Sequence, residues 1–164
     1  MMLVIGNGKL FTRNDEMPFV ENGAVAIEGT KIAAVGETEA IKKQYGDAEF
    51  IDAKGGVIMP GLINAHTHIY SGLARGLSIA GNNPTNFLEV LDGTWWAIDR
   101  HLTLDGTKAC AYATVLDCIR NGVTTIFDHH ASFGEISGSL FAIKDVVKEL
   151  GIRSCLCYEV SERD

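Results

Sequence analysis

The pattern of apolar and polar positions changes character near residue 57. Before that point, short apolar stretches alternate with turn signals, which favours β-strands over helices. Residues 24–27 and 31–35 flank the turn-forming sequence Glu28-Gly29-Thr30 and are expected to pair as a tight hairpin, and residues 48–52 add a further short strand. We therefore expect residues 1–57 to form an all-β segment.

Beyond residue 57 the predicted strands alternate with helices. Strands are expected at 62–69, 123–127 and 152–160, and helices at 86–100 and 139–150. A further helix is expected between Thr103 as N-cap and Gly122 just after its end, with an apolar face made by Ala109, Tyr112, Val115, Leu116 and Ile119. This alternation predicts a parallel sheet over residues 58–164, as the first βα units (strands 1 to 3) of an incomplete TIM barrel, which needs eight strands.

Composition narrows the classes of function. The 164 residues are 46% hydrophobic, enough for a packed core, and 21 acidic against 14 basic residues give a net charge of −7. This balance argues against a nucleic-acid partner or an anionic membrane surface. The chain shows neither a signal-peptide pattern nor an apolar run near the roughly 20 residues of a membrane span. We expect a cytoplasmic protein, with Cys155 and Cys157 as reduced, small core residues; the alternative for these two is a C-x-C metal pair.

The strongest chemical signal is the pair His66 and His68 near the end of a predicted strand. Side chains alternate between the two faces of a strand, so Leu62 and Asn64 are expected on the same face as the histidines, and the face that packs on helices is expected to hold Ile63, Ala65, Thr67 and Ile69. In parallel α/β folds, active sites and ligand-binding sites lie at the carboxyl ends of the strands. Two imidazoles on one face suit zinc or ferrous iron. The alternative is two histidines that form hydrogen bonds in a polar loop.

Residues 56–68, Gly-Val-Ile-Met-Pro-Gly-Leu-Ile-Asn-Ala-His-Thr-His, closely resemble the first barrel strand of the amidohydrolase superfamily. Residues 73–76 (Leu-Ala-Arg-Gly) and 121–128 (Asn-Gly-Val-Thr-Thr-Ile-Phe-Asp) resemble its chlorohydrolase and aminohydrolase (TRZ/ATZ) branch, and segments 69–71, 83–89 and 128–132 resemble SsnA-like aminohydrolases. The resemblance implies a metal-dependent (β/α)8 TIM barrel, preceded by a small β-sandwich (composite) segment over residues 1–57.

The resemblance also implies an activity. Such proteins hydrolyse C–N bonds other than peptide bonds, as deaminases (aminohydrolases) or chlorohydrolases of a cyclic amidine or heterocycle, through a metal-bound hydroxide. The resemblance further implies one divalent metal ion, with zinc preferred and iron as the alternative, and it implies His66 and His68 as two of the ligands. The family's remaining ligands and its proton-transfer aspartate lie on the fifth, sixth and eighth strands. No catalytic residue is therefore expected in this chain, which alone is expected to be inactive; the alternative is a truncated fragment or an assembly module.

Four residues are candidates for binding a small-molecule substrate. Asp99 falls near the substrate-binding acid of related nucleoside deaminases, the alternative being a helix-terminal charge in solvent. Arg75 would bind an acidic group or, alternatively, brace the loop after the first strand. Strand alternation sends Asp128 and His130 to one face and His129 to the other, which leaves open which of them meets the substrate. We also expect the chain to bind further copies of itself and to form a homo-oligomer.

Overall fold

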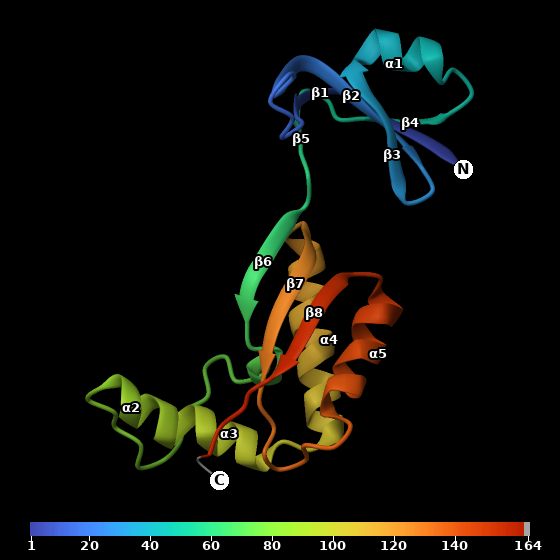
Figure 1. Cartoon of the computed structure of the whole chain (residues 1–164). Helices are drawn as coiled ribbons and strands as arrows, with labels where there is room; N and C mark the ends of the chain where they lie inside the picture. The colour runs from blue at the N-terminus through green and yellow to red at the C-terminus, as the bar shows by residue number, and fades with distance from the viewer. Residues whose placement is uncertain (163–164) are drawn as a thin grey trace. The chain divides into compact units, whose positions relative to one another are not determined.

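The computed structural model describes residues 1–162, and the chain divides into two compact units, Met1–Pro60 and Gly61–Asp164. Figure 1 colours the first unit blue to green and the second green to red. Each unit has its own sheet and its own buried cluster of apolar residues.

The N-terminal unit is a five-stranded sheet with one short helix. Its strands have the order β3-β2-β1-β4, with β5 also paired to β1. Strands β1, β2 and β3 are antiparallel, whereas β4 and β5 run parallel to β1. The elements are β1 (Met2–Phe11), β2 (Phe19–Glu28), β3 (Lys31–Glu37), α1 (Thr38–Gln44), β4 (Glu49–Asp52) and β5 (Val57–Ile58). The predicted hairpin is confirmed: Glu28 pairs with Lys31 across a turn in which Gly29 adopts φ +59°.

The expectation of an all-β segment was wrong at α1. This helix has only seven residues, too few for an apolar period to stand out, and Ile41 is its buried apolar residue. Ile41 packs into a cluster with Val4, Ala24 and Ala26 of the sheet. Within the described residues these strands form one sheet, so a two-sheet sandwich remains a prediction for this segment.

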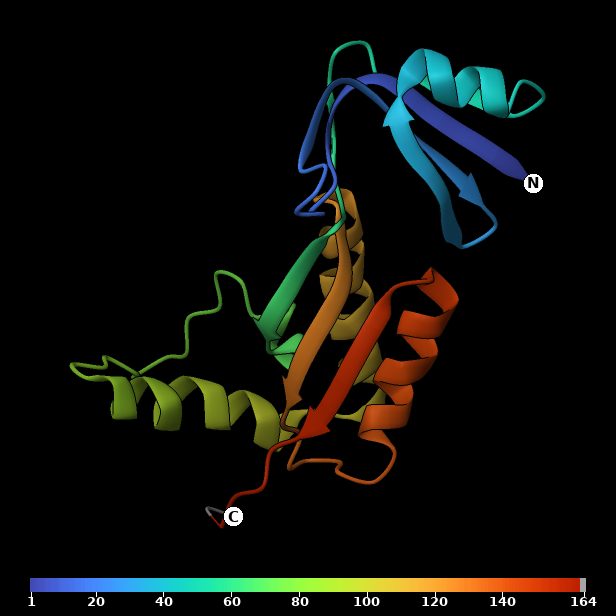
Figure 2. The same cartoon turned by 45° about the horizontal axis from the view of Figure 1, so that its top comes forward.

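The C-terminal unit is built on a parallel three-stranded sheet with the order β6-β7-β8. The strands are β6 (Leu62–Thr67), β7 (Val123–His130) and β8 (Arg153–Tyr158), and the helices that connect them include α4 (Leu104–Arg120) and α5 (Ser139–Leu150). Figure 2 shows α4 and α5 on the same side of the strands. Their residues Val115 and Ile143 share a buried core with Ile126 of β7. We call this side of the sheet the helix face, and the parallel βα arrangement expected from the sequence is confirmed.

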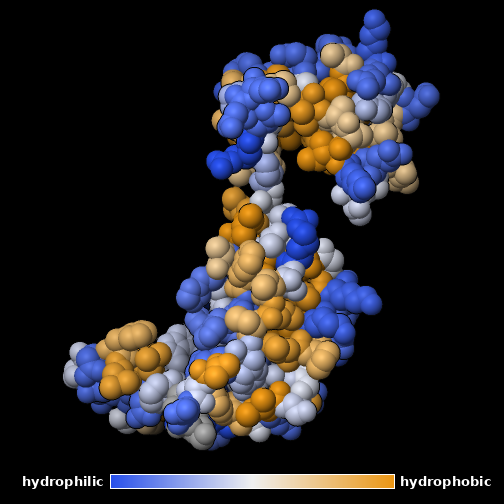
Figure 3. All heavy atoms as spheres, viewed as in Figure 1, coloured by the Kyte–Doolittle hydropathy of each residue, from blue (hydrophilic) through white to orange (hydrophobic). Residues whose placement is uncertain are grey.

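The opposite side of the sheet, the open face, carries exposed side chains. Phe127 of β7 is 44% exposed, and Cys155 and Cys157 of β8 are also exposed. Figure 3 views the unit from this side and shows hydrophobic residues over the strands. The expectation that both cysteines are core residues was therefore wrong, because no other element among the described residues packs on their side of β8.

The helix expected at 86–100 is present, with an irregular middle. It consists of α2 (Phe87–Val90), the π-helical turn η2 (Leu91–Trp95) and α3 (Trp96–His101). The Asn86 side chain caps its start by accepting from the backbone N–H of Glu89. The short 3-10 turn η1 (Ile69–Ser71) follows β6. None of the described helices combines the length and the apolar character that a membrane crossing needs.

The ends of α4 are confirmed, but its predicted buried face is partly wrong. Thr103 caps the helix by accepting from Gly106 N–H at 3.1 Å, and Gly122 follows its end with φ +73°. Ala109, Leu116 and Ile119 were expected to be buried but are exposed, the last two by 40% and 41%. The residues that α4 buries are mostly small, namely Thr107, Cys110, Ala111, Val115 and Cys118. Small side chains let the helix lie close to its neighbours, and a search for large apolar residues does not detect them.

Candidate metal and substrate site

A β-bulge in β6 decides which residues surround the two histidines. Asn64 lies opposite Ile126 and Thr67 lies opposite Asp128, so three steps along β6 match two steps along β7. One extra residue in a strand reverses the facing of the residues after it. Asn64 was expected beside the histidines, but its Nδ2 atom lies 3.9 Å from Cys118 Sγ of α4, on the helix face. The strict alternation predicted for residues 62–69 was therefore wrong at Asn64, and it was also wrong at Ile63 and Ala65, which were expected against the helices but are exposed.

His66 and His68 converge after the bulge. Their Nε2 atoms lie 3.1 Å apart and their ring centroids 5.0 Å apart. The Nδ1 atom of His68 lies 2.9 Å from the carbonyl oxygen of His129. Because a carbonyl oxygen only accepts, Nδ1 of His68 carries the ring proton and donates it. The lone pair of His68 is therefore on Nε2, the atom that faces His66.

This geometry fits two ligands of one divalent ion. Two nitrogens bound to a tetrahedral zinc at about 2.1 Å are separated by about 3.4 Å, close to the 3.1 Å between the two Nε2 atoms. A metal-bound histidine usually donates its other N–H to a carbonyl or carboxylate, as His68 does. Within residues 1–162, no group of three or more His, Cys, Asp and Glu side chains has a metal-holding arrangement. Among the described residues, a metal site here would therefore draw on no more than two such side chains.

The end of β7 divides its polar residues between the two faces. Asp128 and His130 are buried on the helix face, with 3% and 0% of their surface exposed, whereas His129 is exposed. The ring of His129 lies beside that of His68, with 5.5 Å between their centroids. Of the two histidines predicted as substrate-binding candidates, His129 is thus the one beside the converging pair. His130 presents no surface to a substrate in this conformation.

His130 lies in a buried aromatic setting. Its ring stands between those of Tyr70 and Tyr158, at centroid distances of 5.9 and 5.6 Å, and its Nε2 atom lies 3.0 Å from Ser132 Oγ. Burial lowers the pKa of His130 to about 4, because the charged ring loses its hydration. His130 is therefore neutral at pH 7.

Asp128 reaches from β7 to the turn after β6. Its Oδ1 atom accepts from the backbone N–H of Ile69 at 2.8 Å. Burial raises the pKa of Asp128 to about 6, against the opposing effect of this hydrogen bond. This contact was not expected from the sequence. The available signal was an acidic residue directly after the apolar, β-branched run of β7.

Arg75 and Asp99 lie on other elements of the unit. Arg75 Nη2 lies 3.0 Å from Asp117 Oδ2 of α4, which is the contact that a loop-bracing role requires. Asp99 is fully buried in α3, so its alternative interpretation as a charge in solvent was wrong. The carbonyl of Asp99 accepts from Gly134 N–H at 3.0 Å. A substrate role for either side chain stays a prediction.

The chain resembles known proteins in both units. A model of the amidohydrolase family matches residues 57–164, and a model of the bacterial imidazolonepropionase-like composite domain matches residues 23–48. A 5'-deoxyadenosine deaminase of Methanococcoides burtonii is 31% identical over 160 residues, which are 98% of this chain and 33% of that protein. A 5-methylthioadenosine/S-adenosylhomocysteine deaminase of Nitratidesulfovibrio vulgaris is 34% identical over 119 residues, 73% of this chain and 26% of that protein.

The chain also resembles a solved structure. The zinc complex of the atrazine chlorohydrolase TrzN from Arthrobacter aurescens superposes with a TM-score of 0.76 and 26% identity, over 95% of this chain and 35% of that chain. The sheet of the C-terminal unit thus matches part of a TIM-barrel protein. The chain spans about a third of the length of these relatives. Since the family model covers the whole C-terminal unit and the end of the first, the chain belongs to the amidohydrolase family.

Proposed function

We propose that this chain carries part of the metal site of a hydrolase that acts on C–N bonds other than peptide bonds, as a deaminase (aminohydrolase) or chlorohydrolase of a heterocycle. The observation that supports this most directly is the convergence of His66 Nε2 and His68 Nε2 at the end of a parallel strand. Two relatives named as deaminases and one chlorohydrolase solved with zinc agree with it.

In this proposal His66 and His68 hold one divalent ion, with zinc preferred over iron because a structural relative binds zinc. When bound, such an ion lowers the pKa of a water molecule toward 7 and so supplies the nucleophile. The carbonyl of His129 keeps the proton of His68 on Nδ1 and leaves Nε2 free. The exposed ring of His129 then lies where it can contact a small-molecule substrate near the ion.

We further propose that residues 58–164 are the first βα units of the barrel and that the composite segment covers residues 1–57. A catalytic zinc takes three protein ligands and a water. The missing ligands and the proton-transfer group must then come from outside residues 1–162, in a longer chain or in a partner. By itself the 164-residue chain is therefore expected to bind metal weakly and to be inactive.

The test is metal binding and turnover in His66→Ala and His68→Ala, with His101→Ala as the matched control. His101 is an exposed histidine whose Nδ1 lies 2.7 Å from the Ala97 carbonyl oxygen within α3. Cobalt(II) binding is measured by its visible absorption in the 164-residue chain. Turnover is measured in the longest natural protein that contains it, over aminated purine nucleosides and chlorinated triazines. We expect both site variants to lose cobalt binding and turnover and His101→Ala to keep them; full activity in His66→Ala or His68→Ala would overturn the proposal.

A further inference from the structure

We propose that Asp128 is a positioning residue for His68, which it orients by holding the backbone of the next residue, Ile69. The inference rests on the proposed metal site, because His68 is one of its two ligands. Asp128 itself lies on the helix face of β7, behind the strand, and acts on the site through its hydrogen bond to Ile69.

The sheet alone does not fix the position of His68. The regular pairing of β6 with β7 is interrupted between Asn64 and Thr67, and β6 ends at Thr67. His68 has φ −122° and ψ 84° and precedes the turn η1. Its orientation must therefore come from contacts other than the ladder of backbone hydrogen bonds.

Two consecutive residues of β7 supply such contacts to two consecutive residues after β6. Asp128 Oδ1 accepts from Ile69 N–H at 2.8 Å, and the His129 carbonyl accepts from His68 Nδ1 at 2.9 Å. The first bond holds the main chain, and the second holds the ring. If the main chain at Ile69 moved, the distance from His68 to the carbonyl would change with it.

A carboxylate at position 128 is not needed to fill space. The neighbouring helix-face position of β7 is Ile126, which is fully buried in the apolar core, and an apolar side chain at 128 would avoid the cost of burying a charge. The second oxygen, Oδ2, is buried without a hydrogen-bond partner among the described residues. The benefit that offsets this cost is the bond to Ile69, which lies directly beside a proposed ligand.

The experiment compares Asp128→Asn, which keeps an acceptor oxygen, with Asp128→Leu, which removes it. Ile126→Val is the matched control, because it perturbs the same face of the same strand two residues away. The readout is the nitrogen-15 chemical shift of the His68 ring in the whole 164-residue chain without metal, which reports the position of the ring proton. Zinc affinity is measured on the same variants by calorimetry.

We expect wild type, Asp128→Asn and Ile126→Val to keep the proton on Nδ1 of His68. Asp128→Leu is expected to mix the two tautomers and to weaken zinc binding by about 10- to 100-fold. Unchanged His68 shifts and zinc affinity in Asp128→Leu would overturn the inference. If that variant does not fold, Asp128→Ser, whose hydroxyl is too short to reach Ile69, replaces it. The shifts are read without metal, so the tautomer comparison decides the role of Asp128 even where the 164-residue chain, with two of the three protein ligands, binds zinc too weakly to measure. The metal site itself is decided separately, by the turnover of His66→Ala and His68→Ala in the longest natural protein.

Discussion

Asp128 and His130 lie two residues apart on the helix face of β7, and burial shifts their pKa values in opposite directions. The pKa of Asp128 rises from 3.8 to about 6, and that of His130 falls from 6.5 to about 4. Both side chains are almost completely buried, so each avoids its charged form. Between about pH 4 and pH 6 both groups are therefore neutral in the folded chain.

This pair predicts opposite pH slopes in two variants. The folded chain binds the Asp128 proton more tightly than the unfolded chain, so the contribution of Asp128 to stability falls as pH rises from 3.8 to about 6. The folded chain binds the His130 proton less tightly, so the contribution of His130 rises from about pH 4 to 6.5. In wild type the pH dependences of these two contributions to stability nearly cancel. Relative to wild type, Asp128→Asn should therefore gain stability as pH rises through this window, and His130→Gln should lose it, each by roughly 3 kcal/mol.

Urea unfolding of wild type and both variants at several pH values between 4 and 6.5 measures these differences. The absolute stability of each variant does not matter for the test, since only its change with pH is compared. Parallel pH profiles for the two variants would refute the opposite shifts.

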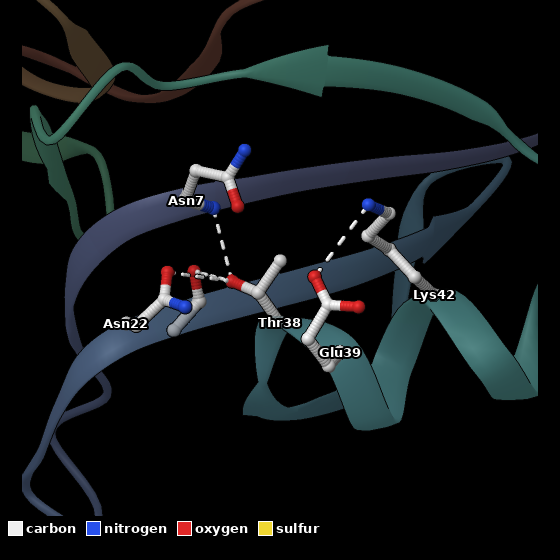
Figure 4. Close-up of polar contacts among 6 residues, drawn as sticks. Asn7, Asn22, Thr38, Glu39 and Lys42 are labelled. Atoms are coloured by element: carbon white, nitrogen blue, oxygen red, sulfur yellow. Dashed lines mark hydrogen bonds and ion pairs between the residues drawn. The ribbon is translucent and has the colours of Figure 1, made fainter.

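Thr38 connects three segments of the N-terminal unit and predicts a local loss of stability. Its hydroxyl accepts from Asn7 N–H at 2.9 Å and lies 3.0 Å from the Gly23 carbonyl and 3.2 Å from Asn22 Oδ1 (Figure 4). Thr38→Val keeps the shape but removes the acceptor of the Asn7 N–H and the buried hydroxyl beside the Gly23 carbonyl, so we expect a loss of about 1–3 kcal/mol. Hydrogen exchange at the Asn7 amide should accelerate in Thr38→Val and stay nearly unchanged in Thr38→Ser. Equal exchange in both variants would contradict this role of the hydroxyl.

Gly72 lets the turn after His68 lie against α4, which predicts a clash on substitution. A Cβ atom at Gly72 would lie 2.2 Å from Thr114 Oγ1 and 2.8 Å from the Cys110 carbonyl oxygen. Gly72→Ala should therefore destabilise the C-terminal unit by about 1–3 kcal/mol. Gly106→Ala is the control: its Cβ would be 3.4 Å from the nearest atoms, and alanine favours the helix by up to about 1 kcal/mol. Thermal unfolding should separate the two variants, and similar melting temperatures would argue against the close packing.

The exposed edge of β6 predicts that the 164-residue chain, expressed by itself, associates with further copies. Leu62 and Ile63 are 49% and 63% exposed, and β6 pairs with a neighbour on one side only within the described sheet. Unpaired strand edges and apolar surface both promote association. Ile63→Lys should shift the chain toward monomer in light scattering after size-exclusion chromatography. Gln44→Lys adds the same charge at an exposed polar site of α1 and should leave the association unchanged. A wild-type chain that is monomeric and melts cooperatively would contradict this prediction.

Much of the local structure could be predicted from the sequence alone. Thr103 and Gly122 mark the ends of α4, and Gly29 marks the hairpin, because capping and positive φ are properties of single residues and their nearest neighbours. The order of strands and helices in the C-terminal unit, and the pair His66 and His68, were also evident from local patterns. These are short-range properties that a pattern along the chain reports directly.

The tertiary structure decided how those elements face one another. A single strand with period two cannot reveal where its pairing with a neighbour becomes irregular, so the bulge that turns Asn64 toward α4 emerged only from the pairing with β7. The buried side of α4 was likewise set by close packing of small residues such as Ala111. Alternation separated His129 from His130, but only the neighbouring strand showed that His129 shares its side with His68. Burial depends on what lies across from a residue, and that information belongs to the pairing of distant segments.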